Sequence, residues 1–202
     1  IRDGRLGTAY GSSAGSVQPV RVFGRMLDTG SMQGVTSTSY IQMMPHTAAV
    51  NVGLFFGLKG RVVPTSSACT SGSQGIGYAY EAIRFGRQQM MLAGGAEELS
   101  APGAAVFDNL FATSCRNEAP ETTPRPFERE RDGLVVGEGA TTLVLEDFDS
   151  ARARGARIYA EIVGYASNSD GLHITQPEAS TMAVVMRDAL ADAGLSASAI
   201  GY

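Results

Sequence analysis

Segments with helical spacing alternate along this chain with short segments whose central residues are apolar in an unbroken run rather than at every second position. The apolar segments include RVVPT at residues 61–65, QQMMLAGGAEE at 88–98 and TTLVLED at 141–147. A strand that is apolar throughout is buried on both faces, which is typical of a mostly parallel sheet between layers of helices. The alternation therefore predicts an α/β fold.

Hydrophobic periodicity and glycine or proline stops predict the remaining elements. Besides the three segments above, strands are expected at residues 6–10 and 157–169, with a further strand beginning in the final SASAIGY. Helices are expected at 17–27, 46–58, 69–85, 104–112, 148–154 and 178–193. Residues 28–39 and 114–131 are interpreted as loops, and Gly60 and Gly86 as the stops of the second and third helices.

Length and charge exclude several classes of protein. A chain of 202 residues can bury a core of one large or two small domains. The net charge of −4 argues against a basic nucleic-acid-binding face, and no apolar run has the length of a membrane-spanning helix. The opening IRDGRLG does not have the pattern of a signal peptide, and two cysteines are too few for a disulfide framework, so a cytoplasmic protein is expected. The first residue, Ile1, indicates a piece of a longer protein.

One of the two cysteines, Cys69, lies in PTSSACTSGSQGIG, between an apolar segment and a helical one. The order strand, tight turn and helix is that of a nucleophile elbow. Free N–H groups and the helix dipole stabilise a thiolate at a helix N-terminus, and small neighbours let a substrate carbonyl approach. The pattern predicts either a nucleophile for acyl transfer or a small buried side chain.

A cysteine nucleophile usually works with a base, and the chain contains two histidines, His46 and His173. Either could form a dyad with Cys69, and either could instead be structural or exposed. The residues alone therefore leave the base open.

Two other features carry weaker signals. Glu97 and Glu98 form a carboxylate pair, for which an acid–base role and a structural role after a strand are the two interpretations, and we favour the structural one. Cys115 has no comparable turn around it, so we expect it to be structural or at the surface.

Five stretches together resemble the condensing β-ketoacyl-[acyl-carrier-protein] synthases, most closely the decarboxylating type that elongates fatty acyl chains. In chain order they are TSSACTSGSQGIGYAYEAI, MLAGGAEELS, TPRPFERERDGLVVGEGATTLVLED, ARARGARIYAEIVGYASNSDG and LADAGLSASAIGY. The resemblance covers nearly the whole chain in the same order.

The resemblance implies a thiolase-like fold, in which two similar halves form αβαβα layers, and a homodimer or a heterodimer. Residues 1–132 would form most of the first half, with the nucleophile elbow, and residues 133–202 the beginning of the second. RVVPT would pair with its twin across the dimer axis. In relatives a His-Gly-Thr strand, a second histidine and a lysine come after this point, so the isolated piece is expected to be inactive.

The implied activity is a decarboxylative Claisen condensation in fatty acid biosynthesis. Cys69 would accept an acyl group from an acyl carrier protein or coenzyme A thioester. Malonyl-carrier would then lose carbon dioxide, assisted by histidines that correspond to neither His46 nor His173, and its carbanion would attack the Cys69 thioester. No metal or organic cofactor is expected, because the phosphopantetheine arm belongs to the carrier.

Three further positions carry over from the resemblance as candidates for substrate binding. Phe107 corresponds to an aromatic residue that borders the acyl channel, and Thr175 to a threonine near the pantetheine entrance. Ala14 corresponds to a position that sets the depth of the acyl pocket, where a small residue leaves room for a longer chain. Ordinary packing or turn chemistry is the alternative for each.

The sequence also departs from the family pattern. Relatives of the primary fatty-acid type often carry basic residues for the acidic carrier before the apolar helix, whereas here SMQGVTSTSYIQMMPH has neither lysine nor arginine. Carrier docking could instead use Arg21, Arg25 or Arg116, or these arginines could form a solvated surface.

Three other functions stay open. The departures raise, as the alternative to fatty acid elongation, a specialised ketosynthase of the aryl-polyene or polyketide type. A non-catalytic partner subunit of the chain-length-factor kind typically lacks the cysteine, so Cys69 argues against it. A thiolase-like degradative enzyme shares the elbow, but PFERERDG…GEGA favours the synthases.

Overall fold

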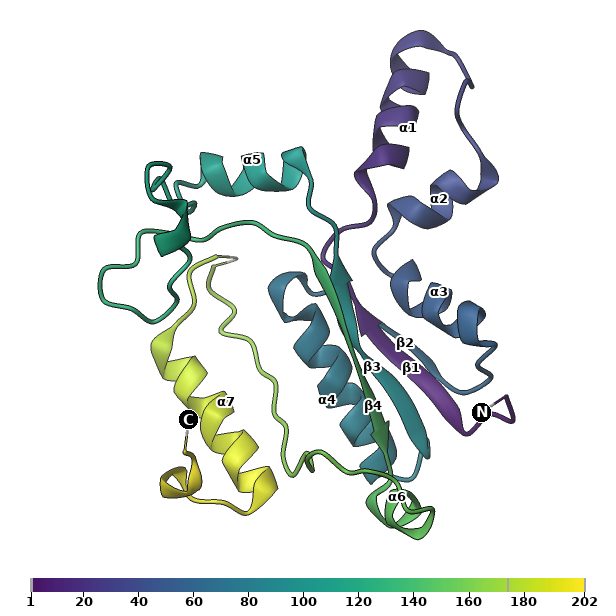
Figure 1. Cartoon of the computed structure of the whole chain (residues 1–202), viewed down its shortest axis with the longest axis vertical. Helices are drawn as coiled ribbons and strands as arrows, with labels where there is room; N and C mark the ends of the chain where they lie inside the picture. Colours follow the sequence, from purple (N-terminus) through teal and green to yellow (C-terminus); the bar gives the residue numbers. More distant parts are fainter. Residues whose placement is uncertain (1, 174, 202) are drawn as a thin grey trace.

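The computed structural model describes residues 2–173 and 175–201, which form one mixed sheet with helices on both faces (Figure 1). The strands are β1 (Leu6–Gly11), β2 (Val62–Thr65), β3 (Met90–Glu97) and β4 (Gly139–Glu146), in the spatial order β2-β1-β3-β4. β1 is parallel to β2 and β3, and β4 is antiparallel to β3. The predicted α/β fold is therefore confirmed.

The helices are α1 (Val17–Thr29), α2 (Ser37–Met43), α3 (Thr47–Phe56), α4 (Ser71–Arg84), α5 (Ala101–Asn109), α6 (Phe148–Ala153) and α7 (Ala179–Ala193), with 3-10 turns η1 (Ala68–Thr70), η2 (Pro120–Thr122) and η3 (Ala197–Ala199). Of these, α3 and α4 cover opposite faces of the sheet. Neighbouring residues of a strand point to opposite faces, and Thr8 of β1 lies near Gly53 of α3, whereas Ala9 packs with Ala79 of α4. The sheet thus lies between α3 and α4.

The core between α4 and the sheet is built from small side chains around one large one. Its fully buried members are Ala9, Ala79, Met91 and Ala93. Gly75 of α4 approaches the sheet so closely that a Cβ there would lie 2.8 Å from the carbonyl oxygen of Ala9. This close approach holds the first half of α4 firmly against the strands.

The outer side of α4 contacts the segment before α7 and α7 itself. The Tyr80 hydroxyl lies 3.1 Å from both the Val163 carbonyl oxygen and an Asp192 carboxylate oxygen. Arg84, one turn further along α4, forms an ion pair with the same carboxylate. Figure 1 shows α7 beside α4, on the side away from the sheet.

The strand predicted at residues 157–169 is not observed, and this prediction was wrong for the chain as described. These residues run alongside α4 without regular structure. A β-strand needs a neighbour to complete its ladder of hydrogen bonds, and no strand among the described residues pairs with this segment. The final residues likewise form the 3-10 turn η3 rather than a strand, and Tyr202 lies outside the described residues.

Helix boundaries in the first 60 residues also differ from the prediction. Residues 28–39 are not all loop, because α1 extends to Thr29 and α2 begins at Ser37, where Thr36 and Ser39 form a capping box. The stop of α3 is Gly57 rather than Gly60: Gly57 has φ 64°, the left-handed conformation of a helix C-cap.

The helix expected at residues 104–112 lies three residues earlier, as α5. Its N-cap is Ser100, whose side chain accepts a hydrogen bond from the N–H of Gly103. Pro102 fits the first turn because the N–H it lacks would have no intrahelical partner there. The other predicted elements agree with the observed ones within a few residues.

Candidate active site

Three neighbouring strands, β2, β1 and β3, end side by side at one edge of the sheet. Candidate site residues lie in the segments that come directly after these ends. Thr65 of β2, Gly11 of β1 and Gly95 of β3 are paired across the sheet. Because these strands are parallel, the residues after them emerge at the same edge. Cys69 follows Thr65, and the loop of residues 12–16 with Ala14 follows Gly11.

Cys69 lies at the bend between β2 and α4, as predicted. It is the middle residue of η1, its side chain is exposed, and α4 begins two residues later. The preceding residue, Ala68, has φ 54°, a left-handed conformation that costs an alanine about 1–2 kcal/mol. Such backbone strain is maintained by surrounding contacts and is frequent at functional turns.

Ser71 provides these contacts. Its hydroxyl donates to the carbonyl of Ala68 at 2.6 Å and accepts the N–H of Ser67 at 2.9 Å. The Thr65 hydroxyl in turn donates to the Ser71 carbonyl at 2.8 Å. Both Ser71 and Thr65 are buried, so the turn that presents Cys69 is fixed from below by interior hydrogen bonds.

Glycines let the start of α4 approach the strands. A Cβ on Gly11 would lie 2.6 Å from the Cβ of Ser71, and a Cβ on Gly95 would lie 3.1 Å from the Cα of Gly72. The first turn of α4 is therefore placed directly over the ends of β1 and β3. The positive end of its dipole faces the region of Cys69, where it stabilises developing negative charge.

Neither histidine is paired with Cys69. His46 is the exposed N-cap residue of α3, and His173 accepts a 3.2 Å hydrogen bond from the backbone N–H of Thr175 through Nδ1. Within residues 2–173 and 175–201, no hydrogen bond joins Cys69 to either imidazole. The described residues thus hold the candidate nucleophile without a histidine base bonded to it.

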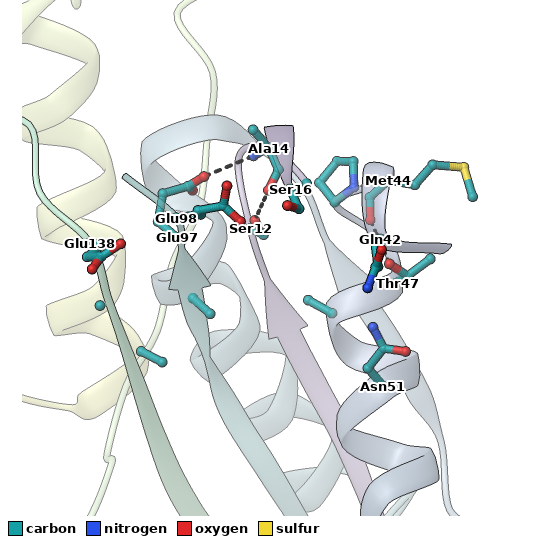
Figure 2. A pocket seen from close by; sticks show the side chains of 16 residues that line it. Ser12, Ala14, Ser16, Gln42, Met44, Thr47, Asn51, Glu97, Glu98 and Glu138 are labelled. Carbon is teal, nitrogen blue, oxygen red and sulfur yellow. Dashed lines mark hydrogen bonds between the residues drawn. The ribbon is translucent and has the colours of Figure 1, made fainter. Parts of the chain in front are cut away.

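A hollow of about 500 Å³ opens at the same edge of the sheet (Figure 2). Ala14 lies in its wall, together with the ends of β3 and β4 and the region where α2 leads into α3. Phe107, half-buried on α5, and the exposed Thr175 are not part of this wall. Of the three substrate-binding candidates, the structure places only Ala14 at a hollow.

Glu97 and Glu98 hold the backbone of the β1–α1 loop. Glu97 accepts the N–H groups of Ser13 at 2.8 Å and Ala14 at 3.2 Å, and Glu98 accepts that of Val17 at 3.3 Å. These bonds support the structural interpretation of the pair. The sequence analysis did not predict that this pair binds the N–H groups of the β1–α1 loop. A signal was present, because the pair follows one strand and the small-residue stretch GSSAGS follows another.

Other candidates have simpler surroundings. Cys115 is an exposed free thiol. Arg116 forms an ion pair with Asp132 at 3.2 Å, whereas Arg21 and Arg25 are exposed on α1.

The described part of the chain holds no group of three or more histidine, cysteine, aspartate or glutamate residues that could bind a metal ion. None of its helices combines the length and apolar character that crossing a bilayer requires.

An exposed cysteine between a strand and a helix of an α/β sheet has the geometry of a nucleophile elbow, which is the class of protein that the fold and the site indicate. Sequence profiles refine this class: the profile "Beta-ketoacyl synthase, N-terminal domain" matches residues 1–151, and "Beta-ketoacyl synthase, C-terminal domain" matches residues 159–202. The chain belongs to the β-ketoacyl synthase family. Our division of the chain between residues 132 and 133 stays a prediction.

Individual relatives lead to the same family as the sequence profiles. The chain is 38% identical over 201 residues to "3-oxoacyl-[acyl-carrier-protein] synthase 2" of Vibrio cholerae, covering 98% of this chain and 49% of the relative. A crystal structure of a β-ketoacyl synthase from Burkholderia phymatum matches with a TM-score of 0.96 and 69% identity, over 100% of this chain and 50% of that one. The chain thus spans about half the length of these relatives, and the thiolase-like fold is confirmed.

A third match comes from a polyketide synthase. It is the structure of a type II PKS acyl-carrier protein in complex with its ketosynthase bound to the hexaketide, with a TM-score of 0.86 and 33% identity to this chain. It covers 100% of this chain and 52% of the other.

Proposed function

We propose that the protein containing this chain is a condensing enzyme, a 3-oxoacyl-[acyl-carrier-protein] synthase of fatty acid biosynthesis. The observation that carries the proposal is the exposed Cys69 on the buried turn between β2 and α4. The 38% identity to a Vibrio cholerae protein of that name supports it. We further propose that the protein acts in the cytoplasm.

The reaction has two stages. The thiolate of Cys69 attacks the carbonyl carbon of an acyl-carrier thioester, the carbon–sulfur bond to the carrier breaks, and the carrier thiol leaves with a proton. Malonyl-carrier then loses carbon dioxide, and the resulting carbanion attacks the acyl carbon on Cys69. A carbon–carbon bond forms, the Cys69 thiolate leaves, and the 3-oxoacyl-carrier is the product.

The residues of this chain contribute position and charge stabilisation to these steps. The first turn of α4 stabilises the thiolate and the oxyanion that forms during each attack. His46 and His173 lie outside this arrangement, so we assign the assistance of decarboxylation to histidines of the remaining part of the family's C-terminal domain. No metal or organic cofactor is required, because the carrier brings its own phosphopantetheine thiol.

We propose that Ala14, Phe107 and Thr175 contact the substrate. Ala14 would meet the acyl chain, because it lies in the wall of the hollow at the edge from which Cys69 emerges. Phe107 and Thr175 rest on the family resemblance alone. We therefore expect substitutions at Ala14 to change acyl-chain preference more than substitutions at the other two.

The expected partners are an acyl carrier protein and a second subunit, identical or homologous. β2 is the edge strand of the described sheet, and Val62 on it is 46% exposed. Leu54 and Phe55 of α3, the helix that packs on β1 and β2, are also exposed. An unpaired edge next to apolar side chains fits a strand-to-strand dimer.

The second candidate function is polyketide or aryl-polyene condensation. The similarity to a polyketide ketosynthase favours it, as does the loop before α3 without lysine or arginine. The chemistry at Cys69 is the same, so only the carrier and the acyl chain differ. The chain-length-factor role remains disfavoured by Cys69.

The proposal is tested by supplying the full-length protein with acyl-carrier and malonyl-carrier thioesters. We expect one carbon dioxide and one 3-oxoacyl-carrier for each malonyl group consumed, and no product from Cys69→Ala. Comparing fatty acid carriers with polyketide carriers separates the two candidates. A full-length protein that binds carriers but never forms a 3-oxoacyl product would support the scaffold role instead.

A further inference from the structure

The loop of residues 12–16 is held by one carboxylate on the side of β3. The Glu97 carboxylate accepts the N–H of Ser13 at 2.8 Å and of Ala14 at 3.2 Å, and it also accepts the Ser13 hydroxyl. Charge-assisted bonds to backbone N–H groups are among the stronger hydrogen bonds in proteins. One side chain therefore holds two successive peptide units of the loop.

Backbone contacts restrain the same loop from the opposite side. The N–H of Ser16 donates to the carbonyl of Gln42 at 2.8 Å. Gly15 lies so close to the chain that a Cβ there would be 2.0 Å from the carbonyl oxygen of Met43. Figure 2 shows the loop between Glu97 on one side and Gln42 and Met44 on the other.

The strand that precedes this loop contacts the turn of the candidate nucleophile, and the loop itself lines the hollow. It begins after Gly11, whose backbone lies against Ser71, the residue that fixes the turn of Cys69. It then places Ala14 in the wall of the hollow. A shift of the Ser13 and Ala14 peptides would therefore change the shape of the hollow while the interior hydrogen bonds of Ser71 keep Cys69 in place.

We propose that Glu97 is a positioning residue that determines acyl-chain selectivity by fixing the loop of residues 12–16. The inference rests on the proposed function, since it concerns the acyl group transferred to Cys69. Glu97 itself lies in the wall of the hollow. Its side-chain hydrogen bonds among the described residues go to Ser13 and Ala14 and not to Cys69, so its role is to position the loop. Its substitution should alter which chains fit and leave the transfer of the shortest chains nearly unchanged.

The test uses the full-length protein and a series of acyl-carrier donors from acetyl to long-chain. Acylation of Cys69 is followed by intact-mass spectrometry in the wild type, Glu97→Gln and Glu97→Asp. Glu121→Gln is the matched control, because Glu121 is exposed and has no hydrogen bond or ion pair among the described residues. Hydrogen exchange of the β1–α1 loop measures its positioning independently of activity.

For Glu97→Gln we expect the ratio of long-chain to short-chain acylation rates to change by about tenfold, since one amide cannot replace both carboxylate acceptors. Exchange of the loop amides should rise, with Glu97→Asp intermediate and Glu121→Gln unchanged. If Glu97→Gln does not fold, Ser13→Ala removes only the hydroxyl bond and should shift the ratio in the same direction.

An unchanged ratio, or an equal fall with every donor, would overturn the inference even if acylation itself occurs. Wild-type protein that accepts no donor would contradict the proposed function, and the selectivity inference would fall with it. The two failures are therefore distinguishable.

Discussion

The ring of Tyr165 lies directly against Gly77 of α4, where any larger residue would collide with it. A Cβ on Gly77 would lie 2.1 Å from two atoms of that ring. Tyr165 also meets Tyr78 edge-on, with ring centroids 6.3 Å apart. This contact joins the helix that follows Cys69 to the segment before α7, two parts of the chain far apart in sequence.

Gly77→Ala should destabilise the protein by about 1–3 kcal/mol, because the added methyl group forces the Tyr165 ring to move. Gly24→Ala is the matched control, since Gly24 also lies in a helix but has no atom within 4 Å of an added Cβ. There alanine should stabilise by about 0.5–1 kcal/mol. Urea unfolding of the full-length protein measures both, and equal effects of the two substitutions would contradict the contact.

The Asp192 carboxylate gives the α4–α7 contact a dependence on pH. The backbone N–H of Tyr165, and then the Tyr80 hydroxyl and the Arg84 guanidinium, hold the pKa of Asp192 below its ordinary value of 3.8. A carboxyl whose folded-state pKa is lowered contributes stability above its unfolded-state pKa and loses that contribution as the pH falls through the folded-state value.

Asp192→Asn should therefore lower stability at neutral pH and make acid unfolding less steep below about pH 4. Asp188→Asn, one turn earlier on α7, is the control, because Asp188 is exposed and has no hydrogen bond or ion pair among the described residues. Thermal unfolding as a function of pH checks this. Parallel pH profiles for wild type and Asp192→Asn would refute the role of Asp192.

Two buried threonines should respond oppositely to the same substitution. Thr8 is fully buried and its hydroxyl has no partner among the described residues, whereas the buried Thr65 hydroxyl donates to the Ser71 carbonyl at 2.8 Å. Thr8→Val should stabilise the protein by about 1 kcal/mol, because valine has nearly the same shape as threonine but lacks the unpaired buried hydroxyl. Thr65→Val should destabilise by about 1–2 kcal/mol and slow acylation at Cys69. Unfolding curves with the same sign for both variants would be inconsistent with these environments.

Sequence reasoning located the elements that carry their own signals. The bend at Cys69 follows from an apolar strand, small residues and a helical spacing, all within residues 61–85. These are local patterns, and the structure reproduces them as β2, η1 and α4. α2 was missed because it is short and its first three residues are serine and threonine, which have little helical propensity, and its capping box at Thr36 decides its position.

Features that depend on residues distant in the sequence could not be predicted from local patterns. Residues 157–169 have the composition of a strand, but a strand needs a neighbour, and none among the described residues lies beside them. Glu97 was interpreted as structural without its partners, because only the strand register brings it beside Ser13 and Ala14. The base that would serve Cys69 also remained open, since neither histidine is bonded to it.

The account depends on Cys69 as the acyl acceptor, and intact-mass spectrometry of the full-length protein with an acyl-carrier donor tests this most directly. Cys115→Ala is the matched control, since Cys115 is the other exposed free thiol. We predict a mass gain of one acyl group in the wild type and in Cys115→Ala, and none in Cys69→Ala. An acyl group that persists in Cys69→Ala, or that never forms with any donor, would contradict the account.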